Sequence, residues 1–268
     1  MIAGTAAAVQ PAHLRVLPLI AALLTALLIQ IGTNFANDVF DFQRGADTHQ
    51  RLGPARITQS GQVTPQRVLA ATAIAFSLAA LIGLYLIAVG GWPILLIGVL
   101  SILAGLAYTG SPFPLAYHGL GDPACFIFFG PIAVAGSAWL QTHQITPLVM
   151  AVSIPVGLLV TAILIVNNVR DIDTDRAAGK RTLAVRLGRN GTRIEYIICV
   201  TGAYVVPLAL LVHRHHLPWL PLFTLPLAVS LIRTVIRETA GPPLNRALRR
   251  TGMLHLLFGS LLAAGLWL

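Results

Sequence analysis

The chain has 268 residues, of which 56% are hydrophobic and only 10% are charged, and its mean hydropathy is +0.79. These values exclude the soluble domains that the length alone would allow and place the chain in the integral membrane class. The net charge of +9 does not indicate a nucleic-acid-binding protein, because no basic stripe with interleaved aromatic residues occurs outside the loops.

Apolar runs predict one short segment and eight membrane-spanning helices in chain order. Residues 2–10 are apolar but too few to cross a hydrocarbon core of ~30 Å, so we expect a partial first helix. The longer runs lie at about 16–37, 66–89, 92–109, 120–140, 147–169, 194–212, 218–236 and 252–268. We therefore expect an all-α bundle that forms a single transmembrane domain over residues 1–268.

Basic residues are distributed very unevenly between the two sides of this bundle. Sixteen of the 18 Lys and Arg residues fall on one side, and only Arg15 and Arg214 fall on the other. Because cytoplasmic loops carry the excess of positive charge, this side is predicted to face the cytoplasm. Cys125 and Cys199 lie in separate apolar runs, so we interpret them as packing residues and expect no disulfide framework.

Most acidic residues gather in two clusters at the ends of apolar runs, with Asp122 lying nearby. The first cluster consists of Asn34, Asn37, Asp38, Asp41 and Asp47. The second cluster consists of Asn167, Asn168, Asp171, Asp173 and Asp175. Each cluster alone is also compatible with solvated residues at a helix end. Two matched clusters instead favour a shared site that cations neutralise.

Helical spacing divides the cluster residues by direction, because residues three and four apart lie on one face. Asn34, Asn37, Asp38 and Asp41 fit one such stripe. Asn167 or Asn168 fits a second stripe with Asp171 and Asp175, whereas Asp173 is predicted to turn away unless the helix has ended. Oxygen ligands of this kind suit Mg²⁺, which completes its coordination shell with water and substrate phosphate.

Cationic residues follow both clusters and fit the recognition of a metal-bound diphosphate. Arg44, Arg51 and Arg56 follow the first cluster, and Arg176, Lys180 and Arg181 follow the second. Lys180 is the only lysine in the chain. Because four predicted helices separate the clusters, we also expect a parallel duplication of a four-helix unit, with the clusters facing each other across a central cavity.

These motifs resemble those of UbiA-type intramembrane aromatic prenyltransferases. Residues 37–47 resemble the family's first aspartate motif, and residues 167–183 are similar to the second motif of its 1,4-dihydroxy-2-naphthoate polyprenyltransferase branch in menaquinone synthesis. Residues 52–61 and 119–130 are typical of the same branch. The resemblance runs from about residue 2 to the end of the chain.

Two departures from the family pattern are visible. Gly45 stands where the wider superfamily often has its third acidic residue, and Asp47 takes that role here, as in the naphthoate branch. The family also usually has a full first helix with an Arg-Pro pair near its start, whereas here Met1 falls within that helix. We therefore expect a shortened first helix.

The resemblance implies a nine-helix fold and Mg²⁺-assisted prenyl transfer. A polyprenyl group would pass from polyprenyl diphosphate to 1,4-dihydroxy-2-naphthoate with loss of the ring carboxylate, giving demethylmenaquinol. It implies two Mg²⁺ ions, one on Asp38, Asp41 and Asp47 and the other on Asp171 and Asp175. Diphosphate binding or ligand orientation is expected of Asn34, Asn37, Arg56, Asn168, Lys180 and Arg181. Asp122 is a candidate base for the acceptor, and its alternative role is a helix N-cap before Pro123.

Other functions remain open from the sequence. Within the same fold, the acceptor would be homogentisate or 4-hydroxybenzoate, or the donor would carry a phytyl group. A cation transporter with paired aspartates belongs to a different class, but its carboxylates should lie near the bilayer midplane and not at helix ends. The His213-Arg214-His215-His216 run lies away from every carboxylate cluster, so we do not expect a metal there. We expect an integral protein of the bacterial inner membrane with a cytoplasmic active site; neither the length of the prenyl tail nor the oligomeric state is predicted.

Overall fold

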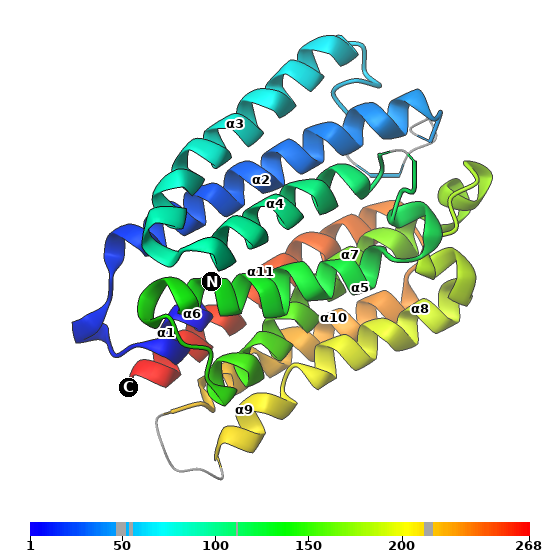
Figure 1. The fold of residues 1–268 in the computed structure, drawn as a ribbon. Coiled ribbons are helices and arrows are strands. Elements are labelled where there is room, and N and C mark those ends of the chain that lie inside the picture. The colour runs from blue at the N-terminus through cyan, green and yellow to red at the C-terminus, as the bar shows by residue number, and fades with distance from the viewer. Residues whose placement is uncertain (47–51, 54–55, 111, 212–216) are drawn as a thin grey trace. The chain divides into compact units, whose positions relative to one another are not determined.

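The computed structural model describes residues 1–46, 52–53, 56–110, 112–211 and 217–268, and the regular secondary structure of these residues is entirely helical (Figure 1). The all-α prediction is therefore confirmed for the described residues. The α-helices, in chain order, are α1 Ile2–Ala8, α2 Val16–Gln43, α3 Pro65–Gly90, α4 Trp92–Ala107, α5 Gly121–Ile127, α6 Ala133–Thr142, α7 Pro147–Ala177, α8 Leu183–Gly202, α9 Val205–Leu210, α10 Leu225–Arg237 and α11 Gly241–Trp267.

Among the residues that the structure describes, six segments are long and apolar enough to cross a bilayer. They are Val16–Gln43, Pro65–Gly90, Gly121–Thr142, Pro147–Ala177, Leu183–Leu210 and Leu220–Arg237. Large apolar side chains project outward from these and neighbouring helices: Leu81, Leu84 and Leu256 are 63–64% exposed. Surfaces this apolar require lipid around them, so the chain is an integral membrane protein.

The chain forms two compact units, each built from separate stretches of sequence. Unit 1 comprises residues 1–19, 125–170 and 189–268, and unit 2 comprises residues 20–124 and 171–188. Unit 2 contains most of α2, all of α3 and α4, the loop that leads into α5, and the end of α7 from Asp171. Unit 1 contains α1, α6, most of α7 and the helices from α9 to α11.

In unit 2, glycine allows α2, α3 and α4 to pack closely. Gly32 of α2 faces the Phe76 ring of α3, and Gly105 of α4 faces the Thr33 side chain of α2. The turn between α3 and α4 uses Gly91 at a φ of 71°, a conformation that favours glycine, and α4 begins at once with Trp92 and Pro93. The predicted stretch 92–109 is therefore a helix, but α4 has only 16 residues.

In unit 1, the short helix α1 packs against α6 and α11. A seven-residue helix, Ile2–Ala8, lies where the sequence predicts a partial first helix. The predicted stretch 120–140 is one helical segment that a π-helical turn at Phe128–Ile132 interrupts, with Pro131 inside the turn. Cys125 and Cys199 lie in different helices and form no disulfide bond.

The two cluster-bearing helices extend beyond the predicted apolar runs. The apolar runs stop at about residues 37 and 169, but α2 continues to Gln43 and α7 to Ala177. Hydropathy marks only the lipid-facing part of a helix, whereas the hydrogen-bonded backbone persists through the polar residues. The described residues of both clusters therefore lie on helices, as the three- and four-residue spacing predicts.

Close packing in unit 1 depends on Gly130, and this leads to a prediction. A Cβ at Gly130 would lie 2.8 Å from the Cα of Gly157 in α7 and 3.0 Å from the Ser153 carbonyl oxygen. We expect Gly130→Ala to lower the free energy of unfolding by about 1–3 kcal/mol, since backbone and not a flexible side chain must move. Thermal unfolding of the purified protein in detergent measures the change.

The matched control is Gly259→Ala in α11, where a Cβ would meet nothing within 4 Å. This change should leave stability unaltered or raise it by about 0.4–1 kcal/mol, because it only restricts the unfolded chain. Equal melting temperatures for the two variants would contradict the close approach at Gly130.

Candidate functional site

The last turns of α2 present three buried polar side chains of the first cluster. Asn37, Asp38 and Asp41 are at most 7% exposed, and their spacing places them on one face of the helix. The Asn37 Oδ1 atom accepts a hydrogen bond of 2.7 Å from the Thr109 hydroxyl. The predicted stripe is thus confirmed for these three residues, whereas Asn34 is exposed.

Asp38 holds the segment that follows α2. Its Oδ2 atom accepts the Ile57 backbone N–H at 3.1 Å, and its Oδ1 atom accepts the Thr58 N–H at 3.4 Å. A buried carboxylate that accepts two backbone N–H groups fixes the position of that backbone. Asp38 therefore also brings Arg56, the preceding residue, close to the end of α2.

Asp41 is the most connected carboxylate of the first cluster. Its Oδ1 atom accepts the Tyr117 hydroxyl at 2.9 Å. Its Oδ2 atom lies 3.0 Å from the Lys180 Nζ atom and 3.9 Å from an Arg56 guanidinium nitrogen. Two cations and a phenol thus surround one buried carboxylate.

Lys180 links the two clusters within unit 2. Its Nζ atom lies 3.0 Å from Asp41 and 3.9 Å from the Asp175 Oδ1 atom, and its side chain is only 11% exposed. One ammonium group therefore contacts a carboxylate from each cluster. The sequence prediction that residues of the two clusters come together is confirmed for Asp41 and Asp175.

The same glycine-dependent turn ends both cluster-bearing helices. Gly45 and Gly179 have φ values of 67° and 73°, the left-handed conformation that terminates many helices. The Ala46 N–H donates to the Asp41 carbonyl at 2.9 Å, and the Lys180 N–H donates to the Asp175 carbonyl at 2.9 Å. An Asp four residues before a capping Gly is thus the local pattern at both sites.

Tyr117, in the loop between α4 and α5, completes the arrangement. The Arg44 guanidinium lies 4.8 Å and the Lys180 Nζ atom 5.0 Å from the centre of its ring, within the range of cation–π attraction. Burial and the Asp41 carboxylate raise the pKa of the Tyr117 hydroxyl, so it stays protonated and donates to Asp41. Sequence analysis does not single out this tyrosine, because nothing in its spacing connects it with the aspartates.

The other predicted site residues are placed as follows. Asp171 and Asn168 are buried in α7, and the Arg181 side chain is exposed while its N–H donates to the Tyr117 carbonyl at 3.1 Å. Asp173 has a side chain that is 75% exposed and pairs with Arg176, so its predicted outward direction is confirmed.

Asp122 is buried in the first turn of α5, where the helix dipole favours a carboxylate. Asp47 and the His213–His216 run lie outside the described residues.

Arg170 differs from the other basic residues of the charged side. It is only 1% exposed within α7, and its guanidinium donates to Asn245 Oδ1 at 2.6 Å and to Asn167 Oδ1 at 2.7 Å. These contacts lie within unit 1. Asn167 thus has a structural role, because its side chain holds the buried Arg170 guanidinium.

The donor set suits Mg²⁺ only in combination with a substrate. Among the residues that the structure describes, no three His, Cys, Asp or Glu side chains gather closely enough to hold a metal by themselves. Asp41 and Asp175 instead share the Lys180 cation, which shows that this position favours positive charge. Mg²⁺ in proteins commonly uses one or two carboxylates and takes its remaining ligands from water and phosphate, and this pair fits that pattern.

Comparison with known proteins gives a consistent result. Residues 1–264 match the family model described as "UbiA prenyltransferase family". The 1,4-dihydroxy-2-naphthoate octaprenyltransferase of Escherichia coli strain K12 is 40% identical over 277 aligned positions, which cover 100% of this chain and 90% of the relative.

Two solved structures share the fold. A UbiA homolog from Aeropyrum pernix K1 superimposes with a TM-score of 0.73 at 16% identity, covering 97% of this chain and 94% of the other. A UbiA homolog from Archaeoglobus fulgidus bound to DMAPP and Mg²⁺ gives a TM-score of 0.68 at 13% identity, covering 99% and 92%. At these identities the likeness concerns the fold alone.

The role of Asp38 as an anchor leads to a prediction that needs no substrate. Asp38→Ala removes the acceptor of the Ile57 and Thr58 N–H groups, so the segment after Arg56 should open more often. We expect trypsin to cleave after Arg56 about tenfold faster in the variant, since hydrogen bonds to a charged group are lost. Mass spectrometry of the fragments locates the cut. Asp173→Ala removes an exposed carboxylate and serves as the control; unchanged cleavage in Asp38→Ala would refute the anchoring role.

Proposed function

The chain belongs to the UbiA prenyltransferase family, and we propose that it transfers a polyprenyl group from polyprenyl diphosphate to 1,4-dihydroxy-2-naphthoate. The ring carboxylate is lost in the reaction, and the product is demethylmenaquinol. The observation that carries this proposal is the identity of 40% over the whole chain to a relative named for this acceptor. The contact of Lys180 with both clusters supports a site built for an anionic substrate.

For the fold, we propose eight full spans and a partial first helix, arranged as two parallel four-helix repeats around a central cavity. The matched capping turns after Asp41 and Asp175 support a repeat. The two units interleave along the chain, which supports a single domain over residues 1–268. We also propose that the cluster-bearing ends face the cytoplasm of a bacterial inner membrane, because 16 of 18 basic residues fall on that side in the predicted topology.

We propose that the site holds two Mg²⁺ ions. Asp38, Asp41 and Asp47 would bind one, and Asp171 and Asp175 the other, with Asn34, Asn37 and Asn168 orienting ligands or diphosphate. Mg²⁺ is bound in the Archaeoglobus fulgidus structure of the same fold, and the donor set of this chain suits it. When bound, Mg²⁺ supplies positive charge that stabilises the diphosphate as it leaves.

Lys180 and Arg56 are the proposed phosphate contacts, assisted by Arg181. Lys180 already lies between the two carboxylates where the diphosphate would bind, so a small rotation of its side chain exchanges a carboxylate partner for a phosphate oxygen. Tyr117 would hold Asp41 in place during this exchange through its hydroxyl. The apolar residues around the clusters would exclude water from the allylic carbon.

Asp122 is the proposed base for the acceptor hydroxyl. It is buried and lies in unit 2 with Asp41, Asp175 and Lys180. A deprotonated hydroxyl makes the naphthoate ring electron-rich at the attacked carbon. The acceptor homogentisate or 4-hydroxybenzoate and a phytyl donor are the alternatives within the family, and the family membership favours all of them over a cation transporter.

An assay of the purified protein in lipid tests the function. With Mg²⁺ and a mixture of prenyl and phytyl diphosphates, we expect a prenylated naphthoquinol without the carboxylate to form from 1,4-dihydroxy-2-naphthoate but not from homogentisate or 4-hydroxybenzoate. Mass spectrometry identifies both donor and acceptor. Product with another acceptor would contradict the proposed substrate, and no product with any acceptor would contradict the proposed activity.

Matched variants in the same assay test the site. Asp175→Ala should abolish turnover, because this carboxylate contacts Lys180 and its side chain is only 16% exposed. Asp173→Ala should retain wild-type rates, because its side chain is 75% exposed. Wild-type turnover in Asp175→Ala would remove Asp175 from the proposed metal site.

Lys180→Ala should raise the KM for the donor about 10- to 100-fold, since a charge-assisted hydrogen bond to phosphate is lost. The KM for the acceptor should change little. Arg176→Ala, which removes an exposed cation paired with Asp173, is the control for a general loss of positive charge. An unchanged donor KM in Lys180→Ala would exclude direct contact with the diphosphate.

A further inference from the structure

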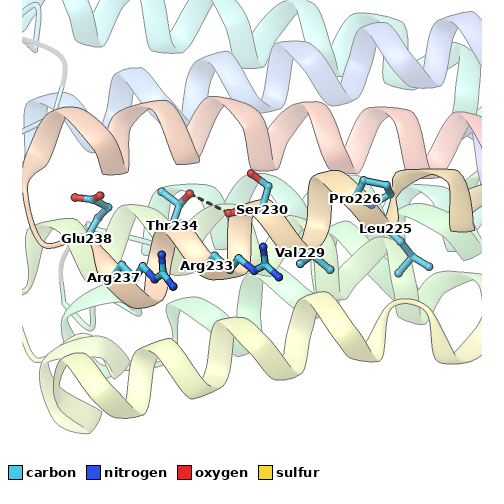
Figure 2. A pocket seen from close by; sticks show the side chains of 8 residues that line it. All are labelled: Leu225, Pro226, Val229, Ser230, Arg233, Thr234, Arg237 and Glu238. Carbon is cyan, nitrogen blue, oxygen red and sulfur yellow. Dashed lines mark hydrogen bonds between the residues drawn. The ribbon is translucent and has the colours of Figure 1, made fainter.

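A groove on α10 lies outside the proposed active site. Its volume is about 710 Å³, which is in the range of small-molecule sites. One row of side chains along the groove is spaced four residues apart and runs in the order Leu225, Val229, Arg233, Arg237. Figure 2 shows these four side chains along the same side of the helix. We call this row and the space beside it the α10 groove.

The groove changes from apolar to cationic along the helix. Leu225 and Val229 are 40% and 44% exposed, and Pro226 beside them extends the apolar part. Arg233 and Arg237 follow one and two turns later, and both are exposed. An apolar half next to a positive half matches a molecule with a hydrocarbon chain and an anionic head.

The two arginines have no acidic partner that would neutralise them. Neither forms an ion pair with a residue that the structure describes. Glu238 lines the groove on the neighbouring row, and in Figure 2 its carboxylate points away from both guanidinium groups. Positive charge in the groove is therefore available to a ligand.

A third arginine adds to the positive half. The Arg250 guanidinium of α11 donates to the Ser230 hydroxyl, which lines the groove, at 3.4 Å. The Thr234 hydroxyl donates to the Ser230 carbonyl at 2.9 Å, so its hydrogen is already used within α10. The polar end thus combines three guanidinium groups with one hydroxyl.

We propose that the α10 groove binds an anionic phospholipid, with its phosphate at Arg233 and Arg237 and an acyl chain along Val229 and Leu225. A basic groove at the end of a membrane-spanning helix lies at the level of lipid headgroups, where arginine attracts anionic lipid. The segment Leu220–Arg237 is one of the six candidate spans, which places its last turns near a membrane surface. This site is independent of the prenyl transfer proposed above.

Titration of the purified full-length protein with phosphatidylglycerol and with phosphatidylcholine, read by native mass spectrometry, tests the proposal. The wild type should prefer phosphatidylglycerol. The double variant R233Q/R237Q should bind it about 30-fold more weakly, the effect expected when two cationic side chains leave an anionic surface. R246Q/R249Q, which removes two arginines of α11 outside the groove, should retain the preference. Equal loss in both double variants, or no loss in R233Q/R237Q, would overturn the proposal.

Further arms distinguish the source of the phosphate. Glycerol 1-phosphate, which has the head but no chains, should not displace phosphatidylglycerol, and L225S/V229S should weaken both lipids. Full displacement by glycerol 1-phosphate would identify a site for free phosphate. Displacement by farnesyl diphosphate that R233Q/R237Q abolishes would identify a second donor site. Either result overturns the lipid assignment, and thermal unfolding in phosphatidylcholine confirms that the variants are folded.

Discussion

The electrostatic balance at the ends of α2 and α7 is the constraint on which the site depends. Both helices place carboxylates in their last turns, where the helix dipole already carries partial negative charge and disfavours them. Burial increases this disadvantage, because Asp38 and Asp41 have little contact with water. The contact of Lys180 with Asp41 and Asp175, and that of Arg56 with Asp41, offset it. The protein thus carries, in its own side chains, the positive charge that the carboxylates require.

The backbone that follows α2 and α7 determines where these cations lie. Gly179 ends α7 in a left-handed conformation, so the chain reverses and Lys180 returns toward Asp175 instead of continuing into solvent. Asp38 fixes the position of Arg56, because its carboxylate accepts hydrogen bonds from the N–H groups of the next two residues, Ile57 and Thr58. The positions of the two phosphate-binding candidates therefore depend on one glycine and one carboxylate that need not touch the diphosphate themselves.

The features that could be predicted from the sequence are those that depend on residues close together in the chain. Apolar runs identify the helices, and three- and four-residue spacing separates inward Asp175 from outward Asp173. The apolar runs end at about residues 37 and 169, before the helices do, because hydropathy marks contact with lipid whereas the helical backbone continues through the polar residues. The anchoring role of Asp38 and the position of Tyr117 depend on contacts between segments 19 and 76 residues apart, which no spacing rule contains. Asn34 fits the stripe but is exposed, since helical phase alone does not show how far along the helix burial extends.

On the proposed function, the cations beside Asp41 and Asp175 would also link the binding of substrate to the binding of a metal. While Lys180 contacts Asp41 and Asp175, those carboxylates are partly neutralised and attract another cation weakly. A diphosphate offers Lys180 and Arg56 stronger anionic partners, and each cation that turns toward it leaves a carboxylate without its positive charge. The affinity of the carboxylates for a metal would rise as a result, and by thermodynamic reciprocity the metal would strengthen diphosphate binding by the same factor. On the proposed function, one lysine between two carboxylates would therefore make the binding of donor and metal cooperative without any movement of the helices.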